Sequence, residues 1–327
     1  MADTLILIWA GLIAFIIAMY VMLDGFDLGI GILFPFVETE EDRDMMMSAI
    51  APVWDGNETW MVLGAACLYG VFPLAYSTIL PDLYIPIFIM LAAFIFRGVS
   101  FEFRFKKHSH KEIWSTAFFL SSLIVTLMQG LIVGTLVQGV KGEQGFDVFN
   151  PFSIMAAVGL VFGYCLLGSS WIIKKTTGAL QEKMYVYCKN SIYFIIVIFA
   201  IVSLWTPYLH PHIYSRWFSM NNLFMLLSMP ILALITLLFL YKSLLKKDEI
   251  KPFFLSMLLF ILALISQVYS IWPYIVPFKY TFWDAAANES SMMFLLVGMC
   301  ILLPVLISYN LYAYWIFRGK VKDIEHY

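Results

Sequence analysis

Charged residues are scarce in this sequence. Only 13% of its 327 residues are Asp, Glu, Lys or Arg, whereas 62% are hydrophobic. An average soluble domain has about 25% charged residues. The formal net charge of −2, with basic residues in short separated clusters, gives no reason to expect a nucleic-acid partner. The composition indicates a polytopic membrane protein.

Cysteine and histidine are few, and their positions exclude two kinds of site. The four cysteines lie far apart without a CxxC pair, so neither a disulfide framework nor a zinc site is indicated. His108 and His110 stand beside lysines and are typical of a solvated charge cluster. All five histidines fall in predicted loops or in the tail: His108, His110, His210, His212 and His326.

Basic residues are absent before the first apolar run. The opening MADTLILIW has an acid and no Lys or Arg, which is not the n-region of a cleaved signal peptide. We therefore expect this segment to stay attached as the first membrane span.

Long polar segments are absent too, so the chain is predicted to be one integral membrane domain over 1–327. A helix that crosses the hydrocarbon core needs about 20 mostly apolar residues. Helices are expected because open sheet edges are not tolerated in lipid. Nine such runs occur, at 5–34, 52–74, 81–103, 112–138, 152–173, 190–208, 223–241, 252–272 and 290–316.

The predicted fold class is an all-α polytopic membrane protein with nine transmembrane helices. The first eight are predicted to form two similar four-helix bundles, with the ninth added. A short sequence echo between 20–25 and 164–168 supports such a duplication only weakly.

Basic residues distinguish the two sides of the membrane. Of the 20 Lys and Arg residues, sixteen lie on the side reached after the first span, three lie on the other side, and Arg97 lies within a span. Positive residues accumulate in cytoplasmic loops. We therefore expect the N-terminus outside and the C-terminus in the cytoplasm.

Against this apolar background, five ionisable residues in the first three spans stand out as a group toward the cytoplasmic side. Asp24 lies roughly 28 Å along the first helix from its start, and Asp27 follows one turn later. Asp55 and Glu58 lie within the first two turns of the next span, and Arg97 lies near the cytoplasmic end of the third. Four carboxylates and one arginine are thus predicted to converge in the cytoplasmic third.

Such residues are costly in a membrane, which gives them two possible explanations. A charged group at the helix centre costs about 2.5 to 3.5 kcal/mol, so it normally faces the bundle interior or water and is paired. One arginine cannot pair with four acids. Some of the carboxyls should be protonated, hydrated or facing a partner protein, and a carboxyl that exchanges protons can relay them. The alternative is that they cap helix ends and mark topology, because acids near a helix N-terminus are favoured by its dipole.

These residues also carry a resemblance. The stretches DGFDLGIG at 24–31, APVWDGNETWM at 51–61 and FRGVSFEFR at 96–104 are similar to subunit II of the cytochrome bd family of bacterial quinol oxidases. SLWTPYL, SIWPYIVP and the closing YNLYAYWIFRGKV fall where that family has similar segments. The similarity therefore runs from end to end.

The resemblance implies the function of a complex and the partner of this chain. A larger subunit I would carry haem b and haem d, and small accessory membrane subunits can accompany the pair. The complex would oxidise quinol at the outer face of the bacterial cytoplasmic membrane and reduce O2 to water with cytoplasmic protons, without pumping. This chain would ligate no haem and would have no cofactor of its own.

The resemblance also suggests roles for the chain: stabilising subunit I, lining a cytoplasmic proton route and offering an oxygen path. Asp27, Asp55 and Arg97 match the family's motif positions, and Asp55 is the preferred relay acid. Trp54 and Trp60 flank Asp55 and are candidates for a subunit contact or gas path, or for simple packing.

Two alternatives stay open. One is a purely structural subunit of the same complex. The other is a secondary transporter, although a transporter site is expected near the midplane at broken helices, where this chain has no acid.

Overall fold

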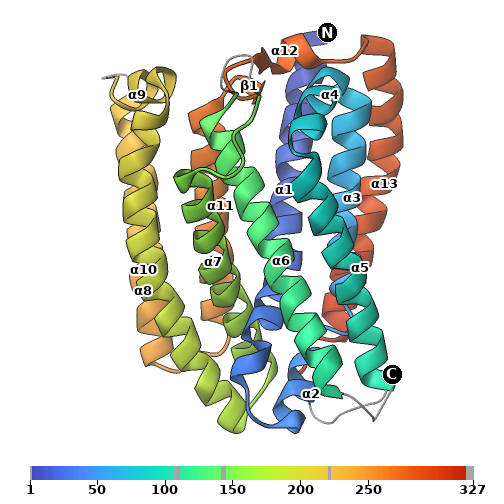
Figure 1. The fold of residues 1–327 in the computed structure, drawn as a ribbon, viewed down its shortest axis with the longest axis vertical. Coiled ribbons are helices and arrows are strands. Elements are labelled where there is room, and N and C mark those ends of the chain that lie inside the picture. Colours follow the sequence, from blue (N-terminus) through green and yellow to red (C-terminus); the bar gives the residue numbers. More distant parts are fainter. Residues whose placement is uncertain (1, 107–110, 141–144, 220–221, 322–327) are drawn as a thin grey trace.

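The protein is a bundle of long helices that run side by side (Figure 1). The computed structural model describes all residues except 1, 107–110, 141–144, 220–221 and 322–327. The long helices are α1 (Ala2–Leu33), α3 (Trp54–Val71), α5 (Tyr84–Lys106), α6 (Lys111–Gln138), α7 (Pro151–Lys175), α8 (Gly178–Leu209), α10 (Leu223–Leu245), α11 (Lys251–Ile271) and α13 (Glu289–Ile316).

The all-α membrane class is confirmed, and every predicted span overlaps one of these helices. Eight of the helices in the described part of the chain are long and apolar enough to cross a membrane. Because α3 is not one of the eight, the count of nine stays a prediction, as does the division into two four-helix bundles. The largest difference in a boundary is at α8, which begins at Gly178 rather than at 190, because its polar first turns continue the helix beyond the apolar run.

The predicted span at 52–74 is interrupted near its end. Helix α3 ends at Val71, and the short helix α4 (Pro73–Asp82) starts directly after Phe72, with Pro73 in its first turn. Proline has no backbone N–H to continue the ladder of α3 but fits the first turn of a new helix. The break therefore follows from Pro73.

Short elements close the two ends of the bundle (Figure 1). One end carries η1 (Phe34–Phe36) and α2 (Glu40–Ser48), which Thr39 caps by accepting a hydrogen bond from the Asp42 N–H. The other end carries α4, α9 (Pro211–Trp217), α12 (Phe282–Ala285) and the two-stranded sheet of β1 (Tyr274–Val276) with β2 (Tyr280–Thr281).

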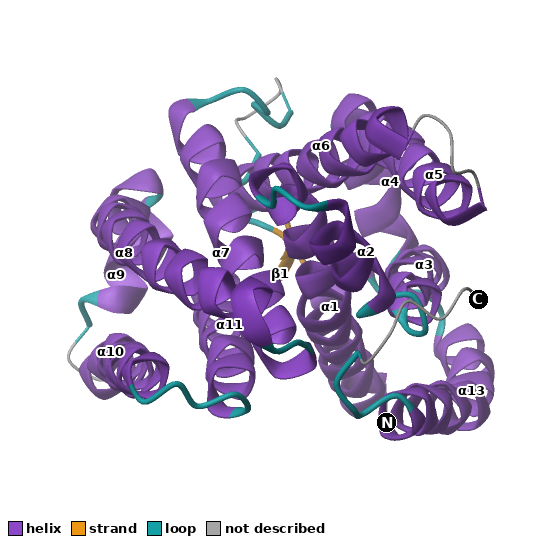
Figure 2. Cartoon of the chain, turned by 90° about the horizontal axis from the view of Figure 1, so that it is seen from below, coloured by secondary structure: helices purple, strands orange, loops and turns teal. Residues whose placement is uncertain are grey.

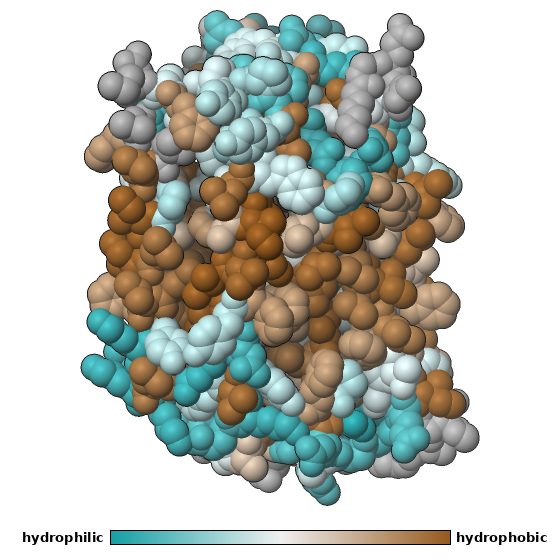
Figure 3. Space-filling view, turned by 60° about the vertical axis from the view of Figure 1, so that its left-hand side comes forward, coloured by the Kyte–Doolittle hydropathy of each residue, from teal (hydrophilic) through white to brown (hydrophobic). Residues whose placement is uncertain are grey.

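The surface has the distribution of a membrane protein. A hydrophobic belt separates two hydrophilic ends (Figure 3). Large apolar side chains of the long helices are exposed, including Phe224, Phe294 and Ile301. Water would not tolerate so continuous an apolar surface, whereas lipid or a partner subunit would.

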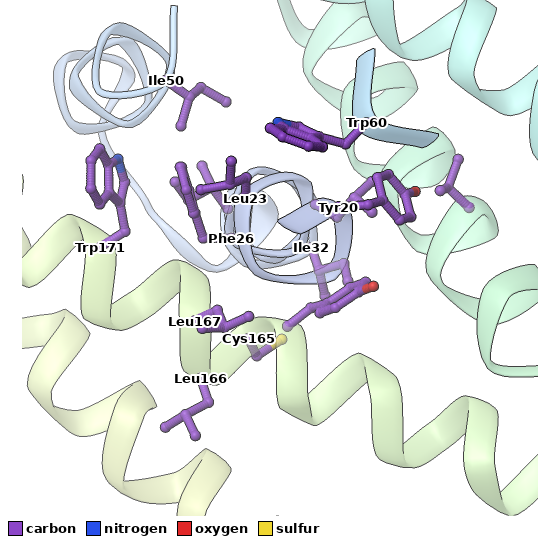
Figure 4. Packing of buried hydrophobic residues seen from close by; sticks show 14 of the residues in the cluster. Tyr20, Leu23, Phe26, Ile32, Ile50, Trp60, Cys165, Leu166, Leu167 and Trp171 are labelled. Atoms are coloured by element: carbon purple, nitrogen blue, oxygen red, sulfur yellow. The ribbon is translucent and has the colours of Figure 1, made fainter. Parts of the chain in front are cut away.

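Helix α1 is the centre of the bundle. It contacts α3, α6 and α7, and it lies between them in the view along the bundle (Figure 2). Residues 22–34 are all buried. Leu23 and Phe26 point toward Trp171 and Ile50 (Figure 4), and the Phe26 and Trp171 rings stack with centroids 4.5 Å apart. Because this part of α1 is covered on every side, each polar side chain in it is held inside protein.

Helices α1 and α7 cross at a pair of glycines. A Cβ placed on Gly29 would lie 1.8 Å from the Tyr164 carbonyl oxygen, and one on Gly168 would lie 2.6 Å from the Gly29 carbonyl carbon. Small residues permit such close backbone approach between membrane helices. The sequences of 20–25 and 164–168 echo each other. The crossing brings the second of these segments against α1 at Gly29, just beyond the first.

We predict that Gly29→Ala lowers the thermal stability and yield of the folded protein, at a cost of about 1 to 3 kcal/mol or more, because the clash is with backbone. Gly11→Ala is the matched control, since it lies on the same helix with no atom within 4 Å of the added Cβ. Thermal unfolding followed by size-exclusion fluorescence measures both. Equal stability of the two variants would contradict the close crossing.

Candidate functional site

Arg97 is the centre of a buried ion cluster. Its Nη1 donates a hydrogen bond of 2.9 Å to Asp24 Oδ1. Asp27 Oδ2 lies 4.0 Å from Nη2, and Glu58 Oε2 lies 3.8 Å from Nη1. Arg97 is 1% exposed and both aspartates are 0% exposed, so lipid and bulk water are excluded from this part of the cluster. Three carboxyl groups thus surround one guanidinium.

The cluster lies toward the end of the bundle that carries α2. Asp24 and Asp27 come from the last third of α1, Glu58 from the second turn of α3, and Arg97 from the second half of α5. The predicted convergence therefore occurs for three of the four acids. Placing this end in the cytoplasm rests on the distribution of basic residues and stays a prediction.

Asp55 lies outside the cluster. Its side chain is exposed, whereas Glu58 is half-buried and reaches Arg97. The buried face of α3 is formed by Asn57, Trp60 and Leu63. Asp55 is two residues, or about 200°, away from Asn57 around the helix and so points to the opposite side.

An amide and a phenol extend the cluster from Asp27. Asn57 donates from Nδ2 to Asp27 Oδ2 at 2.8 Å and to the Leu23 carbonyl at 3.3 Å. The Tyr314 hydroxyl, from α13, donates to Asn57 Oδ1 at 2.8 Å. Asp27 is thereby connected to the last helix of the chain.

A second chain of hydrogen bonds begins one helical turn before Asp24. Tyr164 donates to Gln129 Oε1 at 2.8 Å, and the Gln129 amide donates to the Tyr20 hydroxyl. Tyr20 and Asp24 are four residues apart and share a face of α1. The polar cluster therefore continues from α1 toward α6 and α7.

Several polar atoms of the cluster keep unused hydrogen-bonding capacity. Asp24 Oδ2, Asp27 Oδ1 and the Nε and Nη2 of Arg97 are buried and make no hydrogen bond within the described residues. Buried polar groups in native proteins almost always have a partner, and ordered water is the usual one where protein atoms are out of reach.

The two flanking tryptophans pack inside the chain. The Trp54 ring lies 5.2 Å from the ring of Phe101, and Trp60 contacts Phe15 edge-on with ring centroids 5.9 Å apart. Trp60 is 1% exposed. These positions fit the packing role, while the gas-path and interface roles stay untested.

A second ion cluster, which the sequence reasoning missed, ties α2 to α5 and α6. Arg104, which is 1% exposed, donates to Asp44, to Glu40 at 2.7 Å and to Ser115 at 2.9 Å. Lys111 also donates to Asp44, at 2.9 Å. Burial alone would raise the pKa of Asp44, but the hydrogen bonds and charges of Arg104 and Lys111 lower it overall. The ionised carboxylate that holds α2 in place therefore persists throughout the neutral pH range and is lost only in acid.

An apolar cavity of about 310 Å³ lies between α6, α7, α8, α10 and α11. Its wall includes Gly130, Gly163 and Phe260, and Trp217 and Ser270 also line it. Its α8 and α10 walls lie on the other side of α7 from α5, the helix that carries Arg97 (Figure 2).

Metal-binding groups are not gathered anywhere in the described residues. No set of three or more His, Cys, Asp and Glu side chains there could hold a metal ion. His210 and His212 lie at the start of α9, where the His210 ring stacks on Phe278 with centroids 3.9 Å apart. The predictions for His108, His110 and His326 lie outside the described residues.

Sequence reasoning also missed the neutral members of the site. Asn57 stands inside the motif WDGNETW, and Gln129 is an amide in the middle of an apolar run, so both carried a signal. Tyr20, Tyr164 and Tyr314 carried none, because tyrosine is common in spans and only the fold shows which hydroxyl faces inward.

A bundle of long helices with a hydrophobic belt and a largely buried cluster of three acids and one arginine defines a multi-pass membrane protein with a polar interior site. A family model for subunit II of cytochrome bd terminal oxidases matches residues 5–317. The chain belongs to that family, and it is accordingly a subunit of an oxidoreductase complex of the respiratory chain.

Individual relatives agree over almost the whole chain. Cytochrome bd-I ubiquinol oxidase subunit 2 of Escherichia coli is 23% identical over 99% of this chain and 97% of its own length. Cytochrome bd ubiquinol oxidase subunit 2 of Bacillus subtilis is 26% identical, with 97% of each protein covered. A chain in the structure of bd oxidase from Geobacillus thermodenitrificans has the same fold, with a TM-score of 0.80 at 17% identity over 96% of this chain and 98% of that one.

Proposed function

We propose that this chain is the haem-free subunit II of a quinol:O2 oxidoreductase of the cytochrome bd type, and that its buried carboxyl cluster lines a proton route from the cytoplasm. The larger subunit I would hold haem b and haem d and would act on quinol and O2. The observation that carries the proton route is the arrangement of Asp24, Asp27 and Glu58 around Arg97, all within 4.0 Å.

Charge balance supports a relay at this cluster. One guanidinium compensates one carboxylate, and a second or third uncompensated negative charge in a dry interior would cost several kcal/mol. We infer that the three carboxyls share protons among themselves. The unpartnered oxygens of Asp24 and Asp27 are the places where a water molecule would accept or deliver one.

Glu58 and Asp55 provide the outward connection of the proposed route. The Glu58 side chain is 24% exposed, so it joins the buried aspartates to the outside of the chain. Asp55 lies on an exposed stripe of α3 that continues with Thr59, Val62 and Tyr69. A carboxylate at membrane depth is too costly to face lipid, so we propose that this stripe faces subunit I.

The proposed oxygen path has a candidate in the cavity between α6 and α11. Its lining is mostly apolar, which favours a small apolar molecule such as O2 over water. We propose the cavity as a place where O2 enters the complex from the membrane, whose lipid would surround α8 and α10.

The transporter and the purely structural subunit are tested by different observations. The transporter interpretation has lost its basis, because the family model covers nearly the whole chain and no acid accompanies the proline-containing middle parts of α10 and α13. A purely structural subunit would have the same fold and the same family. Only the activity of carboxyl variants in an assembled complex separates it from a relay subunit.

The first test is to affinity-purify this chain from detergent-solubilised bacterial membranes and record a reduced-minus-oxidised spectrum. We expect haem b and haem d bands and a larger co-purifying membrane subunit, together with any small accessory subunits. A colourless, solitary chain, obtained under conditions in which a control bd oxidase stays intact, would overturn the proposed function.

A further inference from the structure

Asp27 owes its hydrogen-bonding geometry to two residues that do not titrate at neutral pH. Asn57 and Tyr314 form a chain of two hydrogen bonds that we call the Asn57–Tyr314 arm. The Tyr314 hydroxyl donates to the Asn57 amide oxygen and the Asn57 amide nitrogen donates to the Asp27 carboxylate, both at a distance of 2.8 Å. Asn57 is 0% exposed, so water cannot replace either bond from outside. The arm reaches from α13 through α3 to α1.

Every hydrogen-bonding atom of the Asn57 side chain is used. Nδ2 has two hydrogens, which go to Asp27 and to the Leu23 carbonyl, and Oδ1 receives the hydroxyl of Tyr314. A flipped amide would direct Oδ1 at the carboxylate and at the carbonyl, with no donor between three acceptors. The Asp27 carboxylate and the Leu23 carbonyl therefore select the orientation in which Asn57 donates, and the Tyr314 hydroxyl stabilises it by donating to the Oδ1 that faces away from them.

Tyr314 is itself held by α7 and by the segment that follows α13. The Trp171 ring meets the Tyr314 ring edge-on at a centroid distance of 5.8 Å, and Trp171 Nε1 donates to the Ala49 carbonyl. Three residues after Tyr314, the Phe317 carbonyl oxygen accepts a hydrogen bond from the Lys175 ammonium. The same ammonium donates to the Gly319 carbonyl at 2.7 Å.

Further bonds hold the same segment beyond Gly319. The Val321 N–H donates to the Lys175 carbonyl at 2.8 Å, and Lys320 pairs with Glu249 at 2.8 Å. The last turn of α13 is thus fixed to the end of α7 even though most of α13 is exposed. This is the arrangement expected of a helix end that must present one side chain accurately.

We propose that Tyr314 and Asn57 are positioning residues that orient the Asp27 carboxyl group and stabilise its ionised form each time it has released a proton. This inference rests on the proposed relay function of Asp27. It gives α13 and the segment at 317–321 a defined contribution to turnover, besides anchoring the end of the chain.

The physical consequence concerns the proton on Asp27. Without the Tyr314 hydroxyl, Asn57 Oδ1 is a buried acceptor without a donor, and the amide gains by rotating away from Asp27 to find one. The carboxylate then loses its donor and retains a proton to higher pH. Loss of one such bond changes a rate by about three- to tenfold.

The experiment uses the purified two-subunit complex and compares O2 consumption as a function of pH in Tyr314→Phe, Asn57→Ala and the double variant. We expect each single variant to lower turnover about three- to tenfold at neutral pH and to move the midpoint of the pH profile upward. The double variant should be no worse than Asn57→Ala, because Tyr314 acts through Asn57. Haem content should equal that of the wild type.

Tyr312→Phe is the matched control, because Tyr312 lies two residues earlier on α13 and is 62% exposed. It should leave both turnover and the pH profile unchanged.

Asp27→Asn distinguishes the positioning role of Tyr314 and Asn57 from the relay role of Asp27. If Asp27→Asn slows turnover but Tyr314→Phe does not move the profile, the positioning role is overturned and the relay stands. If Asp27→Asn retains wild-type turnover, the relay through Asp27 fails and the positioning inference fails with it. Additive effects in the double variant would also overturn the inference.

Discussion

Membranes that carry Arg97→Met are expected to contain no assembled oxidase. Arg97 is the one cation within 4.0 Å of Asp24, Asp27 and Glu58 among the ion pairs of the described residues. Removing one partner of a buried ion pair costs about 3 to 5 kcal/mol, because the other charge is left uncompensated. Since folded domains are stable by only about 5 to 15 kcal/mol, we expect loss of the haem bands and of the co-purifying subunit.

A second-site change tests the reason for that loss. Arg97→Met combined with Asp24→Leu removes both partners of the 2.9 Å pair and should recover part of the assembled complex, as apolar replacements of buried pairs often do. Arg318→Met is the control, because Arg318 is an exposed arginine on the same predicted side of the membrane. Wild-type haem content in Arg97→Met would show that the cluster is hydrated well enough to do without a cation, although Arg97 is buried in the structure.

The helices of the fold could be predicted because lipid leaves few alternatives. An apolar run of about 20 residues in a membrane must satisfy its backbone internally, so each of the nine runs predicted a helix. The sequence also contained the reason for the break after α3, since Pro73 cannot continue a helix. Hydropathy does not show which helices are neighbours. Nothing in the apolar runs indicates that residues 22–34 are buried on all sides or that Gly29 meets α7.

The candidate site was predictable in its charges and not in its geometry. Charge in an apolar run is rare enough to mark Asp24, Asp27 and Arg97, and the fold brings them together. Spacing by three residues suggested that Asp55 would accompany Glu58, but a helix face is about 100° wide and Asn57 is the residue at its centre. Which of Asp55 and Glu58 faces the cluster therefore depends on the orientation of α3, and that orientation is decided by packing against α1.

Asp27→Asn is expected to lower O2 consumption on the order of 100-fold while haem content and the reduced-minus-oxidised spectrum stay normal. A group that takes and gives protons contributes about 10²- to 10⁴-fold to a rate. The amide is nearly the same size as the carboxyl and cannot be protonated or deprotonated at neutral pH. It keeps the packing of α1 and can still interact with Asn57, which is 2.8 Å away, so assembly should survive.

Asp248→Asn is the matched control for this variant, because Asp248 is a carboxylate between α10 and α11 that pairs with Lys251 and lies outside the cluster. It should retain wild-type turnover. Asp55→Asn, measured together with Asp27→Asn, locates the route. A loss of turnover comparable to that of Asp27→Asn would place Asp55 on the path of the proton across the α3 stripe. Normal turnover would leave Glu58 as the outward connection. Wild-type turnover in Asp27→Asn and in Asp55→Asn alike, with haems intact, would mean that the charges of this chain serve the assembly of its partner alone. The reason for that outcome would be structural, because Arg97 and Asp24 can stabilise the junction of α1 and α5 without any proton passing through it.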